Sequence, residues 1–526
     1  MNEQESKFSR RDFFKGAVAS GVAATTVGLM AACSPQAKGK GNDTPLSSTG
    51  DIAWDVETDV LVVGFGAAGA SAAIEAKRGG AEVTIVETTE AGGGSTVLCG
   101  GFIYLGGTPL QEQLGVKDSV EETLKYMTAA AGPYANQEAL KIYCENGPDT
   151  YQFCIDCGIK FGENLDLNHG VSGRAGIGLA YSGNELQAPY RDIAVPAPRG
   201  HSTGDACGKG IFEPMKKTVE AEGIQVVYGA NAERLIRDET GRVIGAEVTC
   251  DGKQQYFRAA KAVILAGGGF TMNRDMIDAN NRFTTPFGGP IGNPNELGTC
   301  IKMGQEVGAD LFGMSQICYT CFIYGTDTST AKAILVDKTG RRIISETSYG
   351  SWVGEALMAN GPEAYLVFDS ALKGSFDGSG DSPEFEAGAI AGATEFEAGT
   401  ITELAEQLGI DPLSLENTVA LYNTFAEQGE DGQFGKEPEY LAPIATPPFY
   451  ARPYGSESAF YTSEGGLKTD VESHVISVSG DVIPGLYAAG RCSSLIYGHY
   501  MGSGTSIADC ITFGRIAGQN AAAETA

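Results

Sequence analysis

The hydrophobic positions between residues 58 and 87 follow the pattern of a strand, a helix and a second strand. Residues 59–63 (DVLVV) form a short, β-branched apolar run, as a strand buried on both faces requires. Small apolar residues then recur at helical spacing, and residues 82–87 (EVTIVE) form a second strand-like run. Two later runs, at 260–265 and 483–488, each lead into a glycine turn. This alternation predicts an α/β fold with a parallel sheet.

Three glycines at the first strand–helix junction, Gly64, Gly66 and Gly69, form a G-x-G-x-x-G motif. In such a motif the glycines provide a tight turn, a close approach of backbone to a pyrophosphate, and close packing of helix on strand. The helix N-terminus offers amide groups and the positive end of its dipole to phosphates. Glu87 ends the second strand, where it can accept hydrogen bonds from ribose hydroxyls. Together these features predict a dinucleotide-binding module.

Further glycine-rich segments favour FAD over NAD as the dinucleotide. They lie at residues 91–107, 260–270 and 483–491. A flavin dinucleotide is long and is held on several sides, so glycine segments that return to it are expected, whereas NAD needs only the first motif. The first of these segments is of the kind that lies against an isoalloxazine ring. FAD is therefore the predicted cofactor.

The composition is that of an ordinary globular protein. The chain has 526 residues, of which 42% are hydrophobic and 20% charged, and this length favours more than one domain. The net charge of −29 argues against nucleic-acid binding, because phosphate would be repelled. An acidic surface suits a basic protein partner, or serves only solubility.

The first 33 residues have the pattern of an export signal. Arg10 and Arg11 precede a weakly apolar run that ends at Cys33, and adjacent arginines specify the twin-arginine route for proteins that fold before export. Residues 29–33 (LMAAC) resemble a lipobox, which predicts a lipid anchor on Cys33; the alternative is plain cleavage nearby. Residues 34–50 are predicted to form a flexible tether. The expected location is the periplasm or the outer face of the cytoplasmic membrane, where electrons must come from a separate membrane or cytochrome partner.

Two C-x-x-C pairs, Cys154–Cys157 and Cys318–Cys321, leave three interpretations open. Four thiolates could hold zinc or an iron–sulfur cluster, the pairs could form disulfides after export, or the thiols could be free and buried. Buried free thiols are the ordinary case, so no metal site is predicted.

From about residue 55 to its end, the chain resembles the flavoprotein superfamily of fumarate reductases and 3-ketosteroid dehydrogenases. The segments that carry the resemblance are AILVDKTGRRIISE (333–346), TITELAEQLGIDPLSLENTVALYN (400–423), PFYA (448–451), GGLKTD (465–470), GLYAAG (485–490) and GTSIADCITFGRIAG (504–518). The resemblance implies a Rossmann-like FAD-binding domain in two pieces, 51–290 and 451–526. An inserted α+β cap domain, 291–450, closes over the flavin.

The glycine segments and the resemblance together predict the residues that contact FAD. They are Gly64, Gly66, Ala68, Gly69, Glu87, Gly93, Gly94, Ser95, Thr96, Gly100, Gly101, Ala230, Ala266, Gly267, Gly268, Gly490, Arg491, Thr505, Ser506 and Ile507.

Three departures from the fumarate reductases argue against a dicarboxylate substrate. Their proton-donating arginine matches Ser329, a histidine matches Thr462, and a carboxylate-binding arginine matches Met501. Arginine is the natural bidentate partner of a carboxylate, so its loss removes the means of holding one. An enoate reductase for another unsaturated acid stays open as an alternative, with Arg491 or Lys332 as the cation. A flavin electron carrier without its own substrate is a third possibility.

Residues 500–504 (YMGSG) resemble the Tyr-x-x-x-Gly of 3-ketosteroid dehydrogenases. The resemblance implies that Tyr500 exchanges a proton with the carbon next to a ketone. It implies that the Gly504 amide polarises the ketone oxygen together with a tyrosine hydroxyl, from Tyr319 or Tyr324. Phenols and backbone amides suit these two roles. The predicted substrate is a small hydrophobic, steroid-like enone, with the Δ1 or Δ4 position left open and reduction as the expected direction.

Overall fold

The computed structural model describes residues 52–169, 177–281, 289–323, 329–361, 363–376, 395–455, 460–493 and 495–525. The predicted signal and tether, and Tyr324, lie outside these ranges. Ser48–Ala526 forms one compact unit. Within the described ranges, no helix combines the length and the apolar character needed to cross a bilayer.

The main sheet has eight strands. Six of them are hydrogen-bonded in the order β20-β21-β10-β1-β2-β7, and the β8–β9 hairpin adds two more by pairing of β9 with β10. Its strands are β1 (Val56–Val63), β2 (Val83–Val86), β7 (Gln225–Val227), β8 (Ala230–Arg237), β9 (Val243–Cys250), β10 (Lys253–Leu265), β20 (His474–Ile476) and β21 (Val482–Ala488). β1 pairs in parallel with β2 and β10, and β10 pairs in parallel with β21. The predicted strands and the α/β class are confirmed.

Apolar clusters cover both faces of this sheet, which explains the continuous hydrophobic run in β1. Val60 and Val62 belong to one core cluster, while Leu61 and Val63 belong to the other. Successive side chains of a strand point to opposite faces, so the part of β1 that is buried on both sides, residues 60–63, is uniformly apolar.

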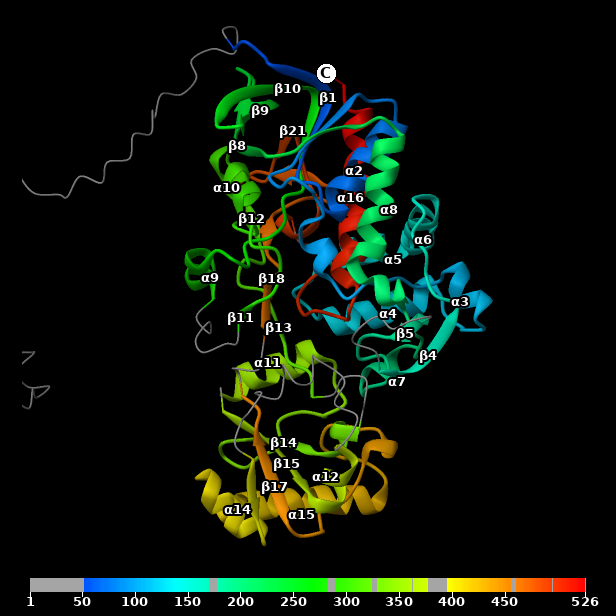
Figure 1. The fold of residues 1–526 in the computed structure, drawn as a ribbon, viewed down its shortest axis with the longest axis vertical. Helices are drawn as coiled ribbons and strands as arrows, with labels where there is room; N and C mark the ends of the chain where they lie inside the picture. Colours follow the sequence, from blue (N-terminus) through cyan, green and yellow to red (C-terminus); the bar gives the residue numbers. More distant parts are fainter. Residues whose placement is uncertain are drawn as a thin grey trace, which may run out of the picture. The chain divides into compact units, whose positions relative to one another are not determined.

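Three helices cover one face: α2 (Ala67–Arg78), α8 (Cys207–Ala221) and α16 (Thr505–Ala523) (Figure 1). α2 and α16 touch backbone to backbone. A Cβ on Gly514 would lie 2.6 Å from the Ala68 oxygen, and one on Gly518 would lie 2.2 Å from the Ala72 oxygen. The small residues of both helices therefore bring the C-terminal segment against the dinucleotide motif at the start of the chain.

Residues on the other face come from segments far apart in the sequence. α10 (Thr299–Glu306) and β13 (Ile317–Thr320) pack with β8, β9 and β10 in a second core cluster. β13 also pairs with β18 (Phe460–Ser463), which pairs with β11 (Gly289–Pro290), while β12 (Leu311–Phe312) pairs with β19 (Gly466–Leu467). Residues just after position 291 thus share a core with the main sheet.

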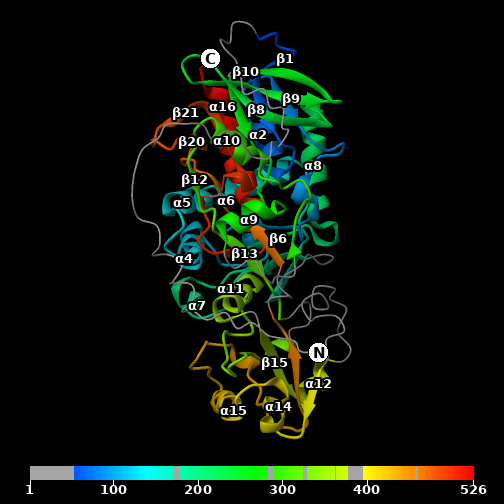
Figure 2. The same ribbon diagram turned by 90° about the vertical axis from the view of Figure 1, so that its left-hand side faces the viewer.

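The cap is built on a four-stranded antiparallel sheet in the order β14-β15-β17-β16. Its elements are β14 (Ile334–Asp337), α11 (Gly350–Asn360), β15 (Ala364–Asp369), α12 (Ser370–Phe376), β16 (Phe396–Ala398), α14 (Ile401–Leu408), α15 (Pro412–Gln428) and β17 (Phe449–Pro453). α14 packs on α15 and on β16 and β17 (Figure 2). This sheet runs from Ile334 to Pro453, and the cap limits of 291 and 450 stay a prediction.

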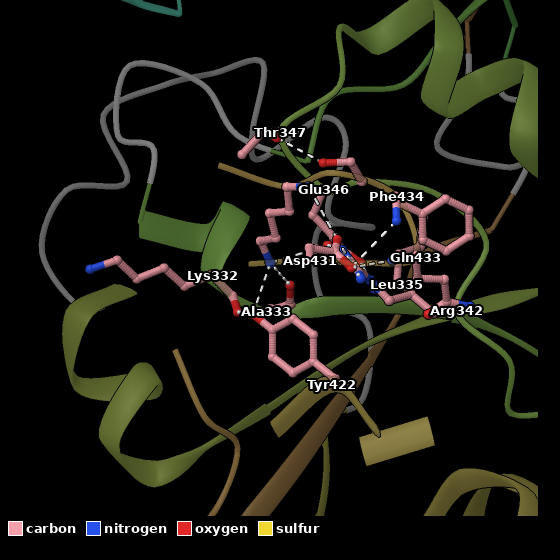
Figure 3. A network of polar contacts seen from close by, with 12 residues as sticks. Lys332, Ala333, Leu335, Arg342, Glu346, Thr347, Tyr422, Asp431, Gln433 and Phe434 are labelled. Carbon is pink, nitrogen blue, oxygen red and sulfur yellow. Dashed lines mark hydrogen bonds and ion pairs between the residues drawn. The ribbon is translucent and has the colours of Figure 1, made fainter. Parts of the chain in front are cut away.

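A buried charge network holds the cap core together (Figure 3). The guanidinium of Arg342 donates to both Glu346 oxygens, at 2.9 and 2.7 Å, and to Asp431 at 2.8 Å. The Lys436 ammonium lies 3.1 Å from Glu346 and donates to the Ala333 carbonyl at 2.9 Å. All four charged side chains are fully buried. Two cations and two anions thus neutralise one another in this core, where an unpaired charge would strongly destabilise the fold.

Arg342→Met is expected to destabilise the cap by about 3–5 kcal/mol, because it leaves two buried carboxylates without their main cation. Urea unfolding of the purified holoprotein measures the change. Arg341→Met is the matched control: that side chain is 71% exposed, and its loss should change stability by less than about 0.5 kcal/mol. Equal stability of the two variants would show that the network contributes nothing beyond a surface pair.

Candidate active site

A cavity of about 710 Å³ lies at the carboxyl ends of the parallel strands. Its lining includes Gly64 after β1, Glu87 after β2, Ala266 after β10 and Ala489 after β21. In open α/β sheets, ligands bind at this edge, and the volume is that of a ligand or cofactor pocket, roughly 300–1,000 Å³.

At one end of this cavity, each of the three motif glycines is needed for a different structural reason. A Cβ on Gly64 would lie 2.6 Å from the Ala266 oxygen, and one on Gly69 would lie 1.9 Å from the Gly64 oxygen. Gly66 is different: its backbone is extended, and a Cβ there would make only an ordinary 3.4 Å contact with Thr96. Because Gly66 lines the cavity, its missing side chain leaves a cradle for a phosphate at the N-terminus of α2.

The carboxylate of Glu87 is fixed in the position expected for a ribose partner. Its Oε2 accepts the Phe65 N–H at 2.8 Å, and its Oε1 accepts the N–H and hydroxyl of Thr89 at 2.8 and 2.7 Å. Each carboxylate oxygen can accept more than one bond, so the group can still receive hydroxyls from the cavity that it lines.

Arg491 is part of the lining, and its charge is neutralised there. The guanidinium pairs with Glu296, which also accepts the Ser95 hydroxyl. The Asn293 N–H in turn donates to Ser95 at 2.8 Å. The carboxylates of Glu296 and Glu464 raise the pKa of Arg491 against the opposing effect of burial. Arg491 is thus a permanent cation that already has an anionic partner.

Two tyrosines, Tyr349 and Tyr500, form part of another region of the lining, and the ring of Tyr497 stacks on Tyr500 from outside it. The Tyr500 ring lies 6.3 Å from Tyr349, at 22°, and 5.9 Å from Tyr497, at 5°. The Tyr349 hydroxyl lies 2.9 Å from the Ser503 hydroxyl. Burial raises the pKa of Tyr500 and Tyr349 well above the ordinary value for tyrosine, so both phenols are protonated at neutral pH.

The loop that carries Tyr500 is held by bonds from neighbouring elements. Tyr126 donates to the Met501 carbonyl at 2.8 Å, and Ser351 donates to the Tyr500 carbonyl at 2.9 Å. The Ser503 N–H donates to the Ser182 carbonyl at 2.7 Å. The loop then enters α16, whose first residues line the cavity. The arrangement therefore fixes the phenol and a helix N-terminus next to the same space.

Most predicted site residues line this one cavity. They are Gly64, Gly66, Ala68, Glu87, Gly94, Ser95, Thr96, Gly100, Ala230, Ala266, Gly267, Gly268, Arg491, Tyr500, Gly504, Ser506 and Ile507. Gly69, Gly93, Gly101, Gly490 and Thr505 are not in the lining but adjoin residues that are.

The structure does not bring Tyr319 to the cavity. Its neighbours on β13, Cys318 and Thr320, line the cavity, whereas the Tyr319 ring belongs to the core cluster behind the strand. The Tyr319 hydroxyl accepts a hydrogen bond from the Asn281 amide at 2.6 Å. Alternation along a strand places Tyr319 on the face opposite to its neighbours. Tyr349 supplies a tyrosine hydroxyl to the lining instead.

Sequence reasoning missed Tyr349, Ser503 and Glu464. Tyr349 directly precedes α11, and 154 residues separate it from Ser503, so no local spacing connects them. Ser503 lies inside the recognised YMGSG segment, where its hydroxyl was a visible signal. Glu464 directly precedes the glycines of the GGLKTD segment, and a carboxylate there was equally visible.

The eleven cysteines in the described ranges are all free. Cys154 and Cys157 are buried under the α2 face, Cys321 lies in the cap core, and Cys318 lines the cavity. Within those ranges, the one group with the geometry of metal ligands is Asp470, Glu472 and His474, with no cysteine in it.

The glycine cradle and the fixed carboxylate of Glu87 along one cavity define a dinucleotide-binding protein. The model of the FAD binding domain family matches residues 59–507, and the chain belongs to this family. The chain is 29% identical to a digoxin reductase of Eggerthella lenta, over 99% of this chain and 98% of that protein. It is also 29% identical to a urocanate reductase of the same organism, over 89% of this chain and 75% of that protein.

Among solved structures, the chain resembles a 3-ketosteroid-Δ4-(5α)-dehydrogenase of Rhodococcus jostii in complex with 4-androstene-3,17-dione. The two are 36% identical, the match covers 91% of this chain and 99% of that one, and the TM-score is 0.83. Other relatives include a probable fumarate reductase and a 3-oxosteroid 1-dehydrogenase. The predicted superfamily and FAD are confirmed. The chain is an FAD-dependent oxidoreductase of the type that acts on carbon–carbon bonds.

Proposed function

We propose that this enzyme transfers hydride to a C=C bond conjugated to a ketone, in a steroid-like substrate. Bound FAD supplies the hydride chemistry; the residues of the chain bind the ketone and manage the proton. The observation that carries the proposal is the joint placement of Tyr500, the Tyr349–Ser503 hydroxyl pair and Gly504 around one part of the cavity.

The charges of the lining support a neutral substrate. Among the described residues that line the cavity, Arg491 is the only cation, and it is paired with Glu296. Glu87, Glu233 and Glu464 add further acids to the lining. A carboxylate substrate would therefore meet repulsion without a free bidentate partner, whereas a ketone needs only hydrogen-bond donors.

Each polar group then has a role. The phenol of Tyr500 holds the proton that the carbon next to the ketone receives, since its raised pKa keeps it protonated. The Tyr349–Ser503 pair can donate one hydroxyl hydrogen to the ketone oxygen. The N–H of Gly504, at the N-terminus of the 19-residue α16, adds a backbone donor and the positive end of the helix dipole. These donors stabilise the enolate charge that develops on oxygen.

The comparisons favour the Δ4 position over Δ1. The structure that the chain matches with a TM-score of 0.83 is a Δ4 enzyme with an androstenedione bound, and the digoxin reductase matches along nearly its whole length. Both relatives support a large hydrophobic ligand.

A reductase for an unsaturated acid is the second candidate, because of the likeness to a urocanate reductase. Such an enzyme needs a cation for the carboxylate. The first of the two predicted candidates, Arg491, is already paired, and the second, Lys332, is not among the residues that line the cavity.

Anaerobic assays with reduced viologen test this function. The holoprotein is expected to reduce a 3-keto-Δ4 steroid and to leave urocanate and fumarate unchanged. An artificial acceptor with the saturated ketone reports the reverse direction. Reduction of either acid without reduction of the steroid would reject the proposal in favour of the second candidate.

We also propose that the enzyme is exported with FAD bound and receives electrons from a membrane or cytochrome partner. The support is the twin-arginine pattern at Arg10 and Arg11 and the lipobox at Cys33. Lys in place of both arginines is expected to leave flavin-loaded protein in the cytoplasm, as seen by cell fractionation and flavin fluorescence. Lys15→Arg is the matched control and should be exported. Normal export of the double variant would contradict the proposed route.

A further inference from the structure

Glu464 is a buried carboxyl group in the cavity lining, and one of its oxygens has no partner among the described residues. The residue is 3% exposed and lines the cavity. The Thr462 hydroxyl donates to its Oε1 at 2.9 Å. Its Oε2 is buried and has no hydrogen-bond partner among the described residues. A buried polar oxygen left in this way is unusual and calls for a ligand or a proton.

The groups around Glu464 leave its charge poorly balanced. Arg491 is the nearby cation, but Glu296 shares it, and Asp509 adds another acid with a raised pKa. The remaining titratable neighbours are phenols and thiols that are uncharged at neutral pH: Cys318, Tyr349, Tyr497, Tyr500 and Cys510. Burial raises the pKa of Glu464 to about 7, against the lowering effect of Arg491 and Thr462.

We propose that Glu464 is a specificity residue that excludes carboxylate ligands from this part of the cavity and accepts neutral carbonyl ligands. The inference rests on the proposed function and names the charge of the substrate that the site takes. An ionised Glu464 repels a second carboxylate in a space of low dielectric, where like charges interact strongly. A protonated Glu464 can donate a hydrogen bond to either ligand.

The proposal makes anion binding depend on proton uptake. A carboxylate ligand binds the protonated form of Glu464, so its affinity is full below the pKa of Glu464 and falls as the pH rises through it. The dissociation constant should rise about tenfold between pH 6 and pH 8, and about tenfold more for each further unit. A neutral ketone of the same shape lacks this repulsion.

The experiment uses the FAD-loaded protein with benzoate and acetophenone as probes, and needs no turnover. Benzoate is ionised throughout the range, and acetophenone is its neutral counterpart. Titrations followed by the change in flavin absorbance give dissociation constants at pH 6, 7 and 8. Benzoate should weaken about tenfold over this range and acetophenone less than about twofold. In Glu464→Gln, benzoate should bind at every pH at least as tightly as it binds the natural protein at pH 6.

Two further variants make the test specific. Thr462→Val removes the donor that stabilises the ionised carboxylate, so the pH at which benzoate weakens should move upward. Glu439→Gln neutralises an exposed acid that does not line the cavity, and it should leave the pH dependence unchanged.

Equal benzoate affinity at pH 6 and pH 8 in the natural protein would overturn the proposal. So would an unchanged pH dependence in Glu464→Gln. Failure of the proposed function has a different signature: the steroid is not reduced, while benzoate binding still depends on Glu464.

Discussion

Tyr500→Phe is expected to retain FAD and to lose turnover by about 10²–10⁴-fold, the usual scale for a lost general acid or base. The phenol lines the cavity, and its raised pKa keeps the proton in place until the neighbouring carbon takes it. The ring itself stacks between Tyr349 and Tyr497, and phenylalanine preserves that stack. The loss should therefore appear in turnover, with protein stability and flavin content unchanged.

Tyr497→Phe is the matched control for this variant. Its ring lies 5.9 Å from Tyr500, its hydroxyl is buried without a hydrogen-bond partner in the described structure, and it does not line the cavity. Removing that hydroxyl should leave turnover within about twofold, because no proton path runs through it. Steady-state rates with reduced viologen and the 3-keto-Δ4 steroid compare the two variants. Full activity of Tyr500→Phe would remove Tyr500 as the proton donor and leave the FAD assignment intact.

Gly66→Val is expected to abolish FAD binding while the protein still folds. The backbone at Gly66 is extended, which valine adopts readily, and a Cβ there meets no atom of the protein closer than 3.4 Å. The new side chain would instead occupy the cradle at the N-terminus of α2, where the pyrophosphate is expected to approach the backbone. The loss is thus one of space for the cofactor, with little strain in the fold.

The ratio of flavin absorbance to protein, measured beside the thermal unfolding of the apoprotein, checks this result. Gly69→Ala is the contrasting variant: its Cβ would lie 1.9 Å from the Gly64 oxygen, so it should lower the stability of the apoprotein itself. A yellow Gly66→Val protein with a full complement of FAD would show that the pyrophosphate does not approach at this position.

The dinucleotide module could be predicted from sequence because its signals are local. The apolar run of β1, the glycines that follow it and Glu87 at the end of β2 lie within 30 residues, and each has a direct backbone reason. A strand whose side chains are buried on both faces of a parallel sheet appears in the sequence as an unbroken hydrophobic run. The FAD-binding edge of the sheet follows from the topology alone, since ligands bind at the carboxyl ends of parallel strands.

The grouping of Tyr500, Tyr349 and Ser503 in the cavity lining depends on contacts between distant segments, which no local sequence pattern reveals. Tyr319 lies on β13, and Tyr349 directly precedes α11. Only the pairing of β13 with β18 directs the Tyr319 ring into the core. Tyr349 meets Ser503 because α11 packs against the loop before α16.

By itself, the sequence determined the α/β class, the cofactor and the identity of Tyr500 as a candidate, because strand periodicity and short motifs act over a few residues. Only the tertiary structure decided which tyrosine shares the cavity with Tyr500 and that Arg491 is already neutralised by Glu296. It alone also showed that one oxygen of Glu464 has no partner in the part of the chain that the structure describes. These properties arise from packing between segments far apart in the chain, where burial and partners, and not residue type, set charge and reactivity.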